Sequence, residues 1–217
     1  MNARDEVLAR VRSALGPGNR SGASDIGPGS RPQPADIPRN YRATTHDGLD
    51  TFLERLAHYD ARAIQTTEGD LDATVRDTLT QREAHDVITP DGIPDGWRSL
   101  KTNPLKDNPP LDNEALDGAD GVVTTCALAI AQTGTIVLDG GMGMGRRALT
   151  LLPDYHLCVV RAEQIVPSVP EALARLDPTR PLTFISGPSA TVDIEMVRVK
   201  GVHGPRTLDV IVVAAPE

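Results

Sequence analysis

The sequence predicts an α/β fold in which a mostly parallel sheet is flanked by helices. Short apolar segments alternate along the chain with segments of helical periodicity, which is typical of successive β-α-β units. Runs such as Ile211-Val212-Val213 are apolar at every position, as expected for strands that are buried on both faces. The 217 residues suffice for one compact domain with an appendage, or at most for two small domains.

The first predicted element is an amphipathic helix over residues 5–15. Val7, Val11 and Leu15 follow one another at a spacing of four, so they lie on one helix face. Gly16-Pro17 ends the helix, because glycine suits a C-terminal cap and proline cannot continue the hydrogen-bonding pattern. The apolar face then needs a surface to cover it, which belongs either to the rest of this chain or to a partner.

A flexible linker is predicted to follow this helix. Between positions 16 and 40, 13 of 25 residues are Gly, Pro or Ser, and such a segment buries too little apolar surface to offset its ordering entropy. The sequence therefore divides into residues 1–40, a helix with its linker, and residues 41–217, the globular domain.

Two helices and two strands are expected in the first part of that domain. In order, they are a helix carrying Leu49, Phe52, Leu53 and Leu56 with Thr45 as its N-cap, a strand over Ala61–Thr66, a helix carrying Leu71, Val75 and Leu79, and a strand over Asp86–Thr89. Pro90-Asp91-Gly92 is a turn signal that stops the last strand. Residues 91–113 are rich in Pro, Asn and Asp and are expected to be mostly irregular.

The second part of the domain carries further strands and a well-marked helix. Strands are predicted over Gly121–Thr125, Thr135–Asp139, Leu157–Val160, Leu182–Ser186 and Leu208–Val213. Cys126–Ala131 is expected to form one small apolar helical turn. Ser168 and Glu171 have the spacing of a capping box, which predicts a helix that runs to Leu176.

Composition argues against several functional classes. The net charge of −8, with no basic cluster longer than Arg146-Arg147, disfavours nucleic-acid binding, and six aromatic residues are too few for a base-stacking surface. No apolar run approaches the ~18 residues of a membrane span, and the N-terminus lacks the apolar region of a secretory signal. The chain is therefore expected to be cytoplasmic, without a membrane span and without a nucleic-acid partner.

The two cysteines, Cys126 and Cys158, are isolated in the sequence. Without a CxxC pair, this chain cannot by itself hold an iron–sulfur cluster or a cysteine-rich zinc site. Both are predicted to be small buried apolar residues, with a catalytic thiol or a disulfide as the alternatives. No metal site is predicted, because the histidines lack the HxH or HxxxH spacing of metal ligands.

Ligands in parallel α/β folds bind at the carboxyl ends of strands, which directs attention to the loops there. In the first loop, the hydroxyls of Thr133 and Thr135 flank Gly134, which would let the backbone approach a ligand; the alternative is a tight turn with side-chain caps. A second, glycine-rich loop over residues 139–147 could present amides to an anion, but it matches no nucleotide-binding pattern, and a flexible surface turn is the alternative.

A third loop leaves the strand that ends near Ile185. Gly187, Pro188 and Ser189 turn the chain, and Ser189 or Thr191 could cap a following helix whose start would favour a phosphate or a carboxylate. Asp193 and Glu195 are two apart and would point to different sides of a helix, so they do not suit a paired acid and base.

For Asp193 and His203, a structural role is an alternative to ligand binding. Asp193 also has a purely structural explanation, in which it complements the helix dipole. His203, beside Gly204 in a glycine-flanked loop, is either a functional imidazole or a structural residue.

These loops, taken in order, resemble the LUD domain, and more narrowly the lactate utilization protein C family. The likeness is carried by the segments AIAQTGTIVL (129–138), LLP (151–153), SGPSATVDIE (186–195) and GVHGP (201–205), and it covers roughly residues 41–217. The resemblance implies a fold similar to the CoA-transferase and ribose-5-phosphate isomerase superfamily. The family pattern has Glu at the position of Gln132, so the covalent glutamate chemistry of CoA transferases is not expected to carry over to this chain.

The resemblance also implies an accessory subunit of a complex that oxidises L-lactate to pyruvate, with iron–sulfur clusters on partner chains and no cofactor in this chain. The residues expected to bind a small anionic ligand are Thr133, Gly134, Thr135, Gly187, Pro188, Ser189, Thr191, Asp193, Glu195, His203 and Gly204. A free-standing enzyme acting on a CoA thioester or a sugar phosphate is one alternative, and an interaction module that docks through the N-terminal helix is another.

Overall fold

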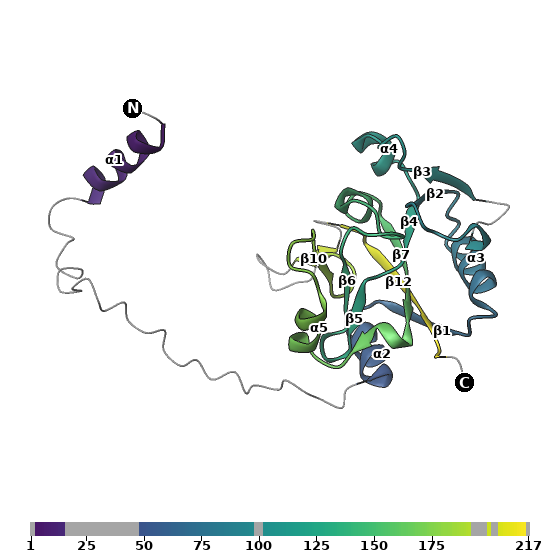
Figure 1. Ribbon diagram of the computed structural model, residues 1–217. Helices are drawn as coiled ribbons and strands as arrows, with labels where there is room; N and C mark the ends of the chain where they lie inside the picture. The colour runs from purple at the N-terminus through teal and green to yellow at the C-terminus, as the bar shows by residue number, and fades with distance from the viewer. Residues whose placement is uncertain (1–2, 16–47, 98–101, 192–198, 201–203, 216–217) are drawn as a thin grey trace. The chain divides into compact units, whose positions relative to one another are not determined.

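A computed structural model of the chain describes residues 3–15, 48–97, 102–191, 199–200 and 204–215 (Figure 1). The chain divides into two units, Met1–Tyr41 and Arg42–Glu217. In the first unit, helix α1 spans Ala3–Leu15, which confirms the predicted helix. Its side chains Val7 and Val11 are exposed. The predicted linker lies outside the described residues.

A six-stranded parallel sheet forms the centre of the second unit. Its strand order is β1 (Arg62–Thr66), β12 (Thr207–Val213), β7 (Tyr155–Arg161), β4 (Gly121–Thr124), β2 (Asp86–Thr89) and β3 (Asn103–Lys106). Every neighbouring pair in this order is parallel. The central strands β7 and β12 are buried along almost their whole length, as their continuous apolar runs predict.

The two faces of this sheet pack against different layers. Helix α3 (Leu71–Gln81) buries Val75 and Leu79 against one face, in a core that includes Ile211 of β12. Helix α2 (Leu49–His58) packs Phe52 and Leu56 into the core on the opposite face, which Val210 of β12 lines. Figure 1 shows α3 on one side of β7 and β12 and the strands β5 and β6 on the other. Alternate residues of one strand therefore serve two cores.

The strands opposite α3 form a second, four-stranded sheet that the sequence did not predict. Its order is β8 (Ile165–Val166), β5 (Leu128–Ile130), β6 (Thr135–Leu138) and β9 (Thr183–Ile185). Strand β6 is antiparallel to both of its neighbours, whereas β5 and β8 are parallel. Helix α5 (Val169–Arg175) packs on this sheet, with Ser168 as N-cap accepting a hydrogen bond from the Glu171 amide, as the capping box predicts.

Several short elements complete the described part of the chain. They are α4 (Asn113–Asp117), the strand pair β10 (Ala190–Thr191) and β11 (Val199–Lys200), and the 3₁₀ turns η2 (Asp95–Trp97), η3 (Ala131–Thr133), η4 (Arg147–Thr150) and η5 (Ala162–Gln164). Among the described residues, every helix falls short of the length and apolarity that crossing a bilayer demands.

One local prediction was wrong, and one segment holds a strand that was not predicted, for reasons that lie in the tertiary structure. Cys126–Ala131 does not form a helical turn, because Leu128–Ile130 is strand β5 with all of its residues buried. A short apolar run of this kind has no periodicity that separates strand from helix. Strand β3 lies inside the segment expected to be irregular, and its Pro104 is tolerated because β3 is an edge strand.

The predicted N-caps at Thr45 and Ser189 were also wrong. Gly48, not Thr45, occupies the N-cap of α2, and Thr45 lies outside the described residues. Ala190–Thr191 pairs as strand β10 with β11, so Ser189 is not the N-cap of a helix; residues 192–198, where a helix capped by Thr191 would lie, are outside the described residues.

Candidate functional site

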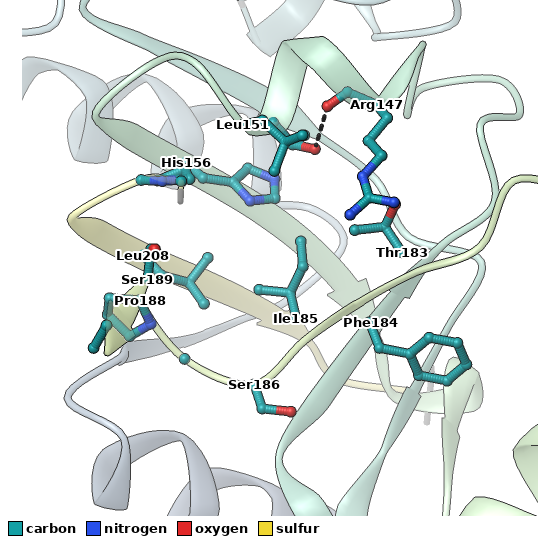
Figure 2. Close-up of a pocket in the computed structure, with 15 residues that line it drawn as sticks. Arg147, Leu151, His156, Thr183, Phe184, Ile185, Ser186, Pro188, Ser189 and Leu208 are labelled. Atoms are coloured by element: carbon teal, nitrogen blue, oxygen red, sulfur yellow. Dashed lines mark hydrogen bonds between the residues drawn. The ribbon is translucent and has the colours of Figure 1, made fainter. Parts of the chain in front are cut away.

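A pocket of about 300 Å³ is lined by both sheets of the second unit. It lies between η4, the first residues of β7 and β12, and β9 with the loop that follows it (Figure 2). Its lining residues are Arg147, Thr150, Leu151, His156, Thr183, Phe184, Ile185, Ser186, Gly187, Pro188, Ser189, Ala190, Gly204, Pro205 and Leu208. This volume is at the lower end of the range for small-molecule sites.

The pocket brings together the predicted loop after β9 and the predicted loop before β12. It lies at the amino ends of the central strands, whereas the carboxyl ends were expected. The Ser189 amide donates to the Pro205 carbonyl at 2.9 Å, so the loop after β9 meets the segment that leads into β12. His156 and Leu208 are the second residues of β7 and β12, so the pocket lies at the amino ends of these central strands. The rule of carboxyl-end binding applies to a single open sheet, and here a second sheet supplies β9 as another wall.

Arg147 supplies the positive charge of this pocket. It begins η4, whose Leu149 is fully buried against Ile88 and Val122, and this anchor fixes the turn. Figure 2 shows the Arg147 side chain extending toward Thr183. Within the part of the chain that the structure describes, no carboxylate pairs with Arg147, and no acidic residue is among the described residues that line the pocket.

The neighbouring Arg146 has a different role. Its guanidinium donates two hydrogen bonds to Asp107, at 2.8 and 2.9 Å, and this contact lowers the pKa of the Asp107 carboxyl. In the glycine-rich loop, the amides of Gly141 and Gly143 donate to Asp139 Oδ1 and to the Asp91 carbonyl at 2.9 and 2.7 Å. These amides are already bonded within the protein, which supports the alternative explanation of this loop as a turn.

Four side chains with hydroxyl groups line the pocket together with Arg147. Thr150, Thr183, Ser186 and Ser189 line the pocket. The Ser186 hydroxyl bonds the Thr135 hydroxyl at 2.7 Å, and Thr135 bonds Thr133 at the same distance. Thr133 and Thr135 therefore contact the pocket through Ser186 and do not line it themselves.

Gly134 packs closely against helix α2 and is not among the residues that line the pocket. Its φ is +59°, and a Cβ at this position would lie 2.6 Å from the Arg55 Cβ of α2. Gly187 does line the pocket, and its φ of +80° places its own missing Cβ 2.5 Å from the Tyr59 Cβ. Both glycines are thus required by the turn and by contact with the end of α2.

The remaining predicted ligand residues divide into two groups. Pro188, Ser189 and Gly204 line the pocket together with Gly187. The backbone of Thr191 belongs to β10, while Asp193, Glu195 and His203 lie outside the described residues. The roles of these four stay predictions.

His156 is a pocket residue that the sequence reasoning missed. Its side chain is 1% exposed, its Nε2 lies 2.8 Å from the Thr124 hydroxyl, and burial lowers its pKa to about 4. The predicted strand began at Leu157, whereas β7 begins at Tyr155 and places His156 inside it. A single histidine next to an apolar strand was the signal that could have found it.

The two cysteines confirm the prediction of buried thiols. Cys126 and Cys158 are free and buried, and no disulfide joins them. The hydrogen bond with Cys158 and burial both raise the pKa of the Cys126 thiol. A protonated, enclosed thiol of this kind is not a nucleophile.

Comparison with known proteins identifies the family. The LUD domain family matches residues 108–213. Lactate utilization protein C of Deinococcus radiodurans is 45% identical over 199 residues, which cover 90% of this chain and 91% of that protein. This chain belongs to the lactate utilization protein C family.

Other members of the family extend the similarity. Lactate utilization protein C of Geobacillus sp. is 28% identical over 97% of this chain and 95% of its own length. The crystal structure of a DUF162 family protein from Deinococcus radiodurans matches with a TM-score of 0.65 and 43% identity, over 76% of this chain and 94% of that one. The family and the mostly parallel α/β fold are thereby confirmed.

Proposed function

We propose that this chain is a cytoplasmic accessory subunit of a complex that oxidises L-lactate to pyruvate, and that its pocket holds a small carboxylate. The names of its relatives support a role in lactate utilization. Oxidation of lactate needs an electron acceptor, and two isolated cysteines cannot bind an iron–sulfur cluster alone. The proposal therefore assigns the clusters to partner chains.

The ligand part of the proposal depends on the charge of the pocket. Arg147 brings a guanidinium without a carboxylate partner among the described residues into a pocket lined by four hydroxyl side chains. A guanidinium binds a carboxylate through charge-assisted, often bidentate hydrogen bonds. Hydroxyl groups can both donate to a carboxylate and accept from a 2-hydroxyl group. Lactate and pyruvate offer this combination in a small volume.

Removing the guanidinium tests this assignment directly. The Arg147→Gln variant is expected to bind L-lactate and pyruvate at least about tenfold more weakly, because a charge-assisted hydrogen bond contributes roughly 1.5–3 kcal/mol. Isothermal titration calorimetry of the full chain measures both affinities. Arg62→Gln is the matched control, since Arg62 is an exposed arginine of β1 whose side chain bonds Gln81 and does not line the pocket.

Two results would overturn the ligand assignment. One is wild-type protein that binds neither lactate nor pyruvate, and the other is equal loss of affinity in the Arg147 and Arg62 variants. Turnover of a CoA thioester or a sugar phosphate by the isolated wild-type chain would instead favour a free-standing enzyme.

A further inference from the structure

His156 occupies a protected position in the wall of the pocket. It is the second residue of β7 and pairs with Leu208 of β12 on one side and with Val122 of β4 on the other. The backbone around it is therefore fixed by two parallel ladders. Figure 2 shows its ring beside Leu151, a residue that also lines the pocket.

The hydrogen bond to Thr124 determines which ring nitrogen carries the proton. Thr124 is fully buried, and within the described residues its hydroxyl has His156 Nε2 as its sole side-chain partner. A buried hydroxyl needs an acceptor for its hydrogen, so Thr124 donates to Nε2. Because burial keeps the ring neutral, the ring hydrogen then resides on Nδ1.

Nδ1 is the ring nitrogen that the Thr124 contact leaves without a partner among the described residues. In the described part of the chain, the Thr124 contact is the one hydrogen bond of the His156 ring. His156 lines the pocket, and Nδ1 is not one of the fully enclosed side-chain polar atoms that lack a partner among the described residues. An unpaired donor on a buried ring that lines a pocket favours an acceptor atom on the ligand.

We infer that His156 Nδ1 donates a hydrogen bond to the oxygen at C2 of the bound acid, so that the pocket selects 2-oxo and 2-hydroxy carboxylates over unsubstituted ones. This inference rests on the proposed function, in which Arg147 binds the carboxylate. Thr124 acts as a positioning residue, because it fixes the ring and its tautomer without facing the ligand.

Arg147 and His156 recognise different parts of the acid: Arg147 binds the charge of the carboxylate, and His156 binds the oxygen at C2. The guanidinium of Arg147 neutralises the carboxylate of any small acid, so it contributes affinity without distinguishing substituents at C2. A neutral N–H group gains little from charge but requires an acceptor. An acid that lacks the C2 oxygen would leave Nδ1–H buried and unpaired, and sites built to bond a substrate group reject analogues without it for this reason.

The test compares pyruvate, L-lactate and propionate, which share a carboxylate and a three-carbon chain but differ at C2. By calorimetry, the wild-type full chain is expected to bind pyruvate and lactate about tenfold or more tightly than propionate. In His156→Gln the amide replaces the ring, and the preference should fall to about twofold or less while propionate affinity stays within about threefold. The Arg147→Gln variant should instead lose affinity for all three acids together.

The tautomer has its own readout, which needs no variant to remain folded. Imidazole ¹⁵N spectra of wild-type protein should show one histidine protonated on Nδ1 at neutral pH, with its Nδ1 resonance shifted by pyruvate and not by propionate. In Thr124→Val, the resonances of this histidine should broaden because both neutral tautomers are populated, and the preference for pyruvate should fall.

The outcomes separate the inference from the proposed function. If wild-type protein binds propionate as tightly as pyruvate, the role of His156 is wrong and the carboxylate pocket stands. If His156→Gln keeps the full preference, or if no histidine resonance responds to pyruvate, the inference fails in the same way. If none of the three acids binds, both the pocket assignment and the inference fail.

Discussion

At the residue scale, the pocket combines one permanent charge with one neutral ring. Arg147 contributes a guanidinium, the most strongly basic side-chain group of proteins, and burial holds His156 neutral by lowering its pKa to about 4. The charge available to a ligand is therefore insensitive to pH in the range where free histidine titrates. Only the structure distinguishes Arg147 from its neighbour, because Asp107 pairs with Arg146.

Protein stability, by contrast, should depend on pH through His156. The ring protonates near pH 6.5 in the unfolded chain and near 4 in the folded protein. Between these values the unfolded state binds the extra proton, so the free energy of unfolding is highest above pH 6.5 and falls by up to about 3 kcal/mol as the pH drops to 4.

Urea denaturation at pH 7.0 and pH 4.5 measures this loss. The His156→Gln variant should lose less stability between the two pH values than wild-type protein does. The control His58→Gln replaces an exposed histidine of α2 and should keep the wild-type pH dependence. Equal pH dependence in wild-type protein and His156→Gln would contradict the buried neutral ring.

At the element scale, the turn before β6 depends on its contact with α2. Gly134 adopts a positive φ, and its missing Cβ would lie 2.6 Å from the Arg55 Cβ and 3.0 Å from the Arg55 carbonyl carbon. The turn also carries Thr133 and Thr135, whose hydroxyls reach the pocket through Ser186. Packing of α2 and placement of these hydroxyls are therefore linked.

Replacing Gly134 by alanine is expected to destabilise the protein by about 1–3 kcal/mol, from backbone strain and from the clash with α2. Gly69→Ala is the control, because a Cβ there would have Thr67 Oγ1 at 3.9 Å as its nearest neighbour. Thermal and urea denaturation followed by circular dichroism measure both variants. A Gly134→Ala protein as stable as Gly69→Ala would show that the turn is not held by this contact.

Elements with a clear period were predictable, and those without one were not. Val75 and Leu79 repeat at helical spacing, and α3 forms as predicted. The run around Leu128 is apolar at each position, so nothing local separates strand β5 from a helical turn. Strand β3 exists because β2 offers it a parallel partner, and no local pattern records that partner.

At the scale of the whole molecule, the chain divides into two units, and the described residues of the first form helix α1. All of the buried core clusters of the described residues draw their members from positions 49 to 213. In α1, Val7 is 59% exposed and Val11 is 49% exposed. The interaction-module alternative rests on this apolar face of α1, which the helix does not bury within itself.

Reconstituted lactate oxidation tests these roles together. We expect lactate-dependent dye reduction by the proposed iron–sulfur partner chains to require the full chain. We also expect residues 42–217 alone to unfold at the same urea concentration as the full chain while supporting less activity. Partner chains that oxidise lactate equally well without this protein would contradict the accessory role. Full activity with residues 42–217 would instead exclude α1 as a docking element.

The sequence by itself determined the family, the parallel α/β class and the order of the periodic elements, because these depend on local patterns of apolar residues and on loop motifs. Tertiary structure alone decided the pocket. It brought Arg147, His156, Ser189 and Gly204 together in the lining of one pocket, although they come from separate segments of the chain. Which charge is left unpaired, and which ring is buried and neutral, depends on partners that only folding brings within hydrogen-bond distance.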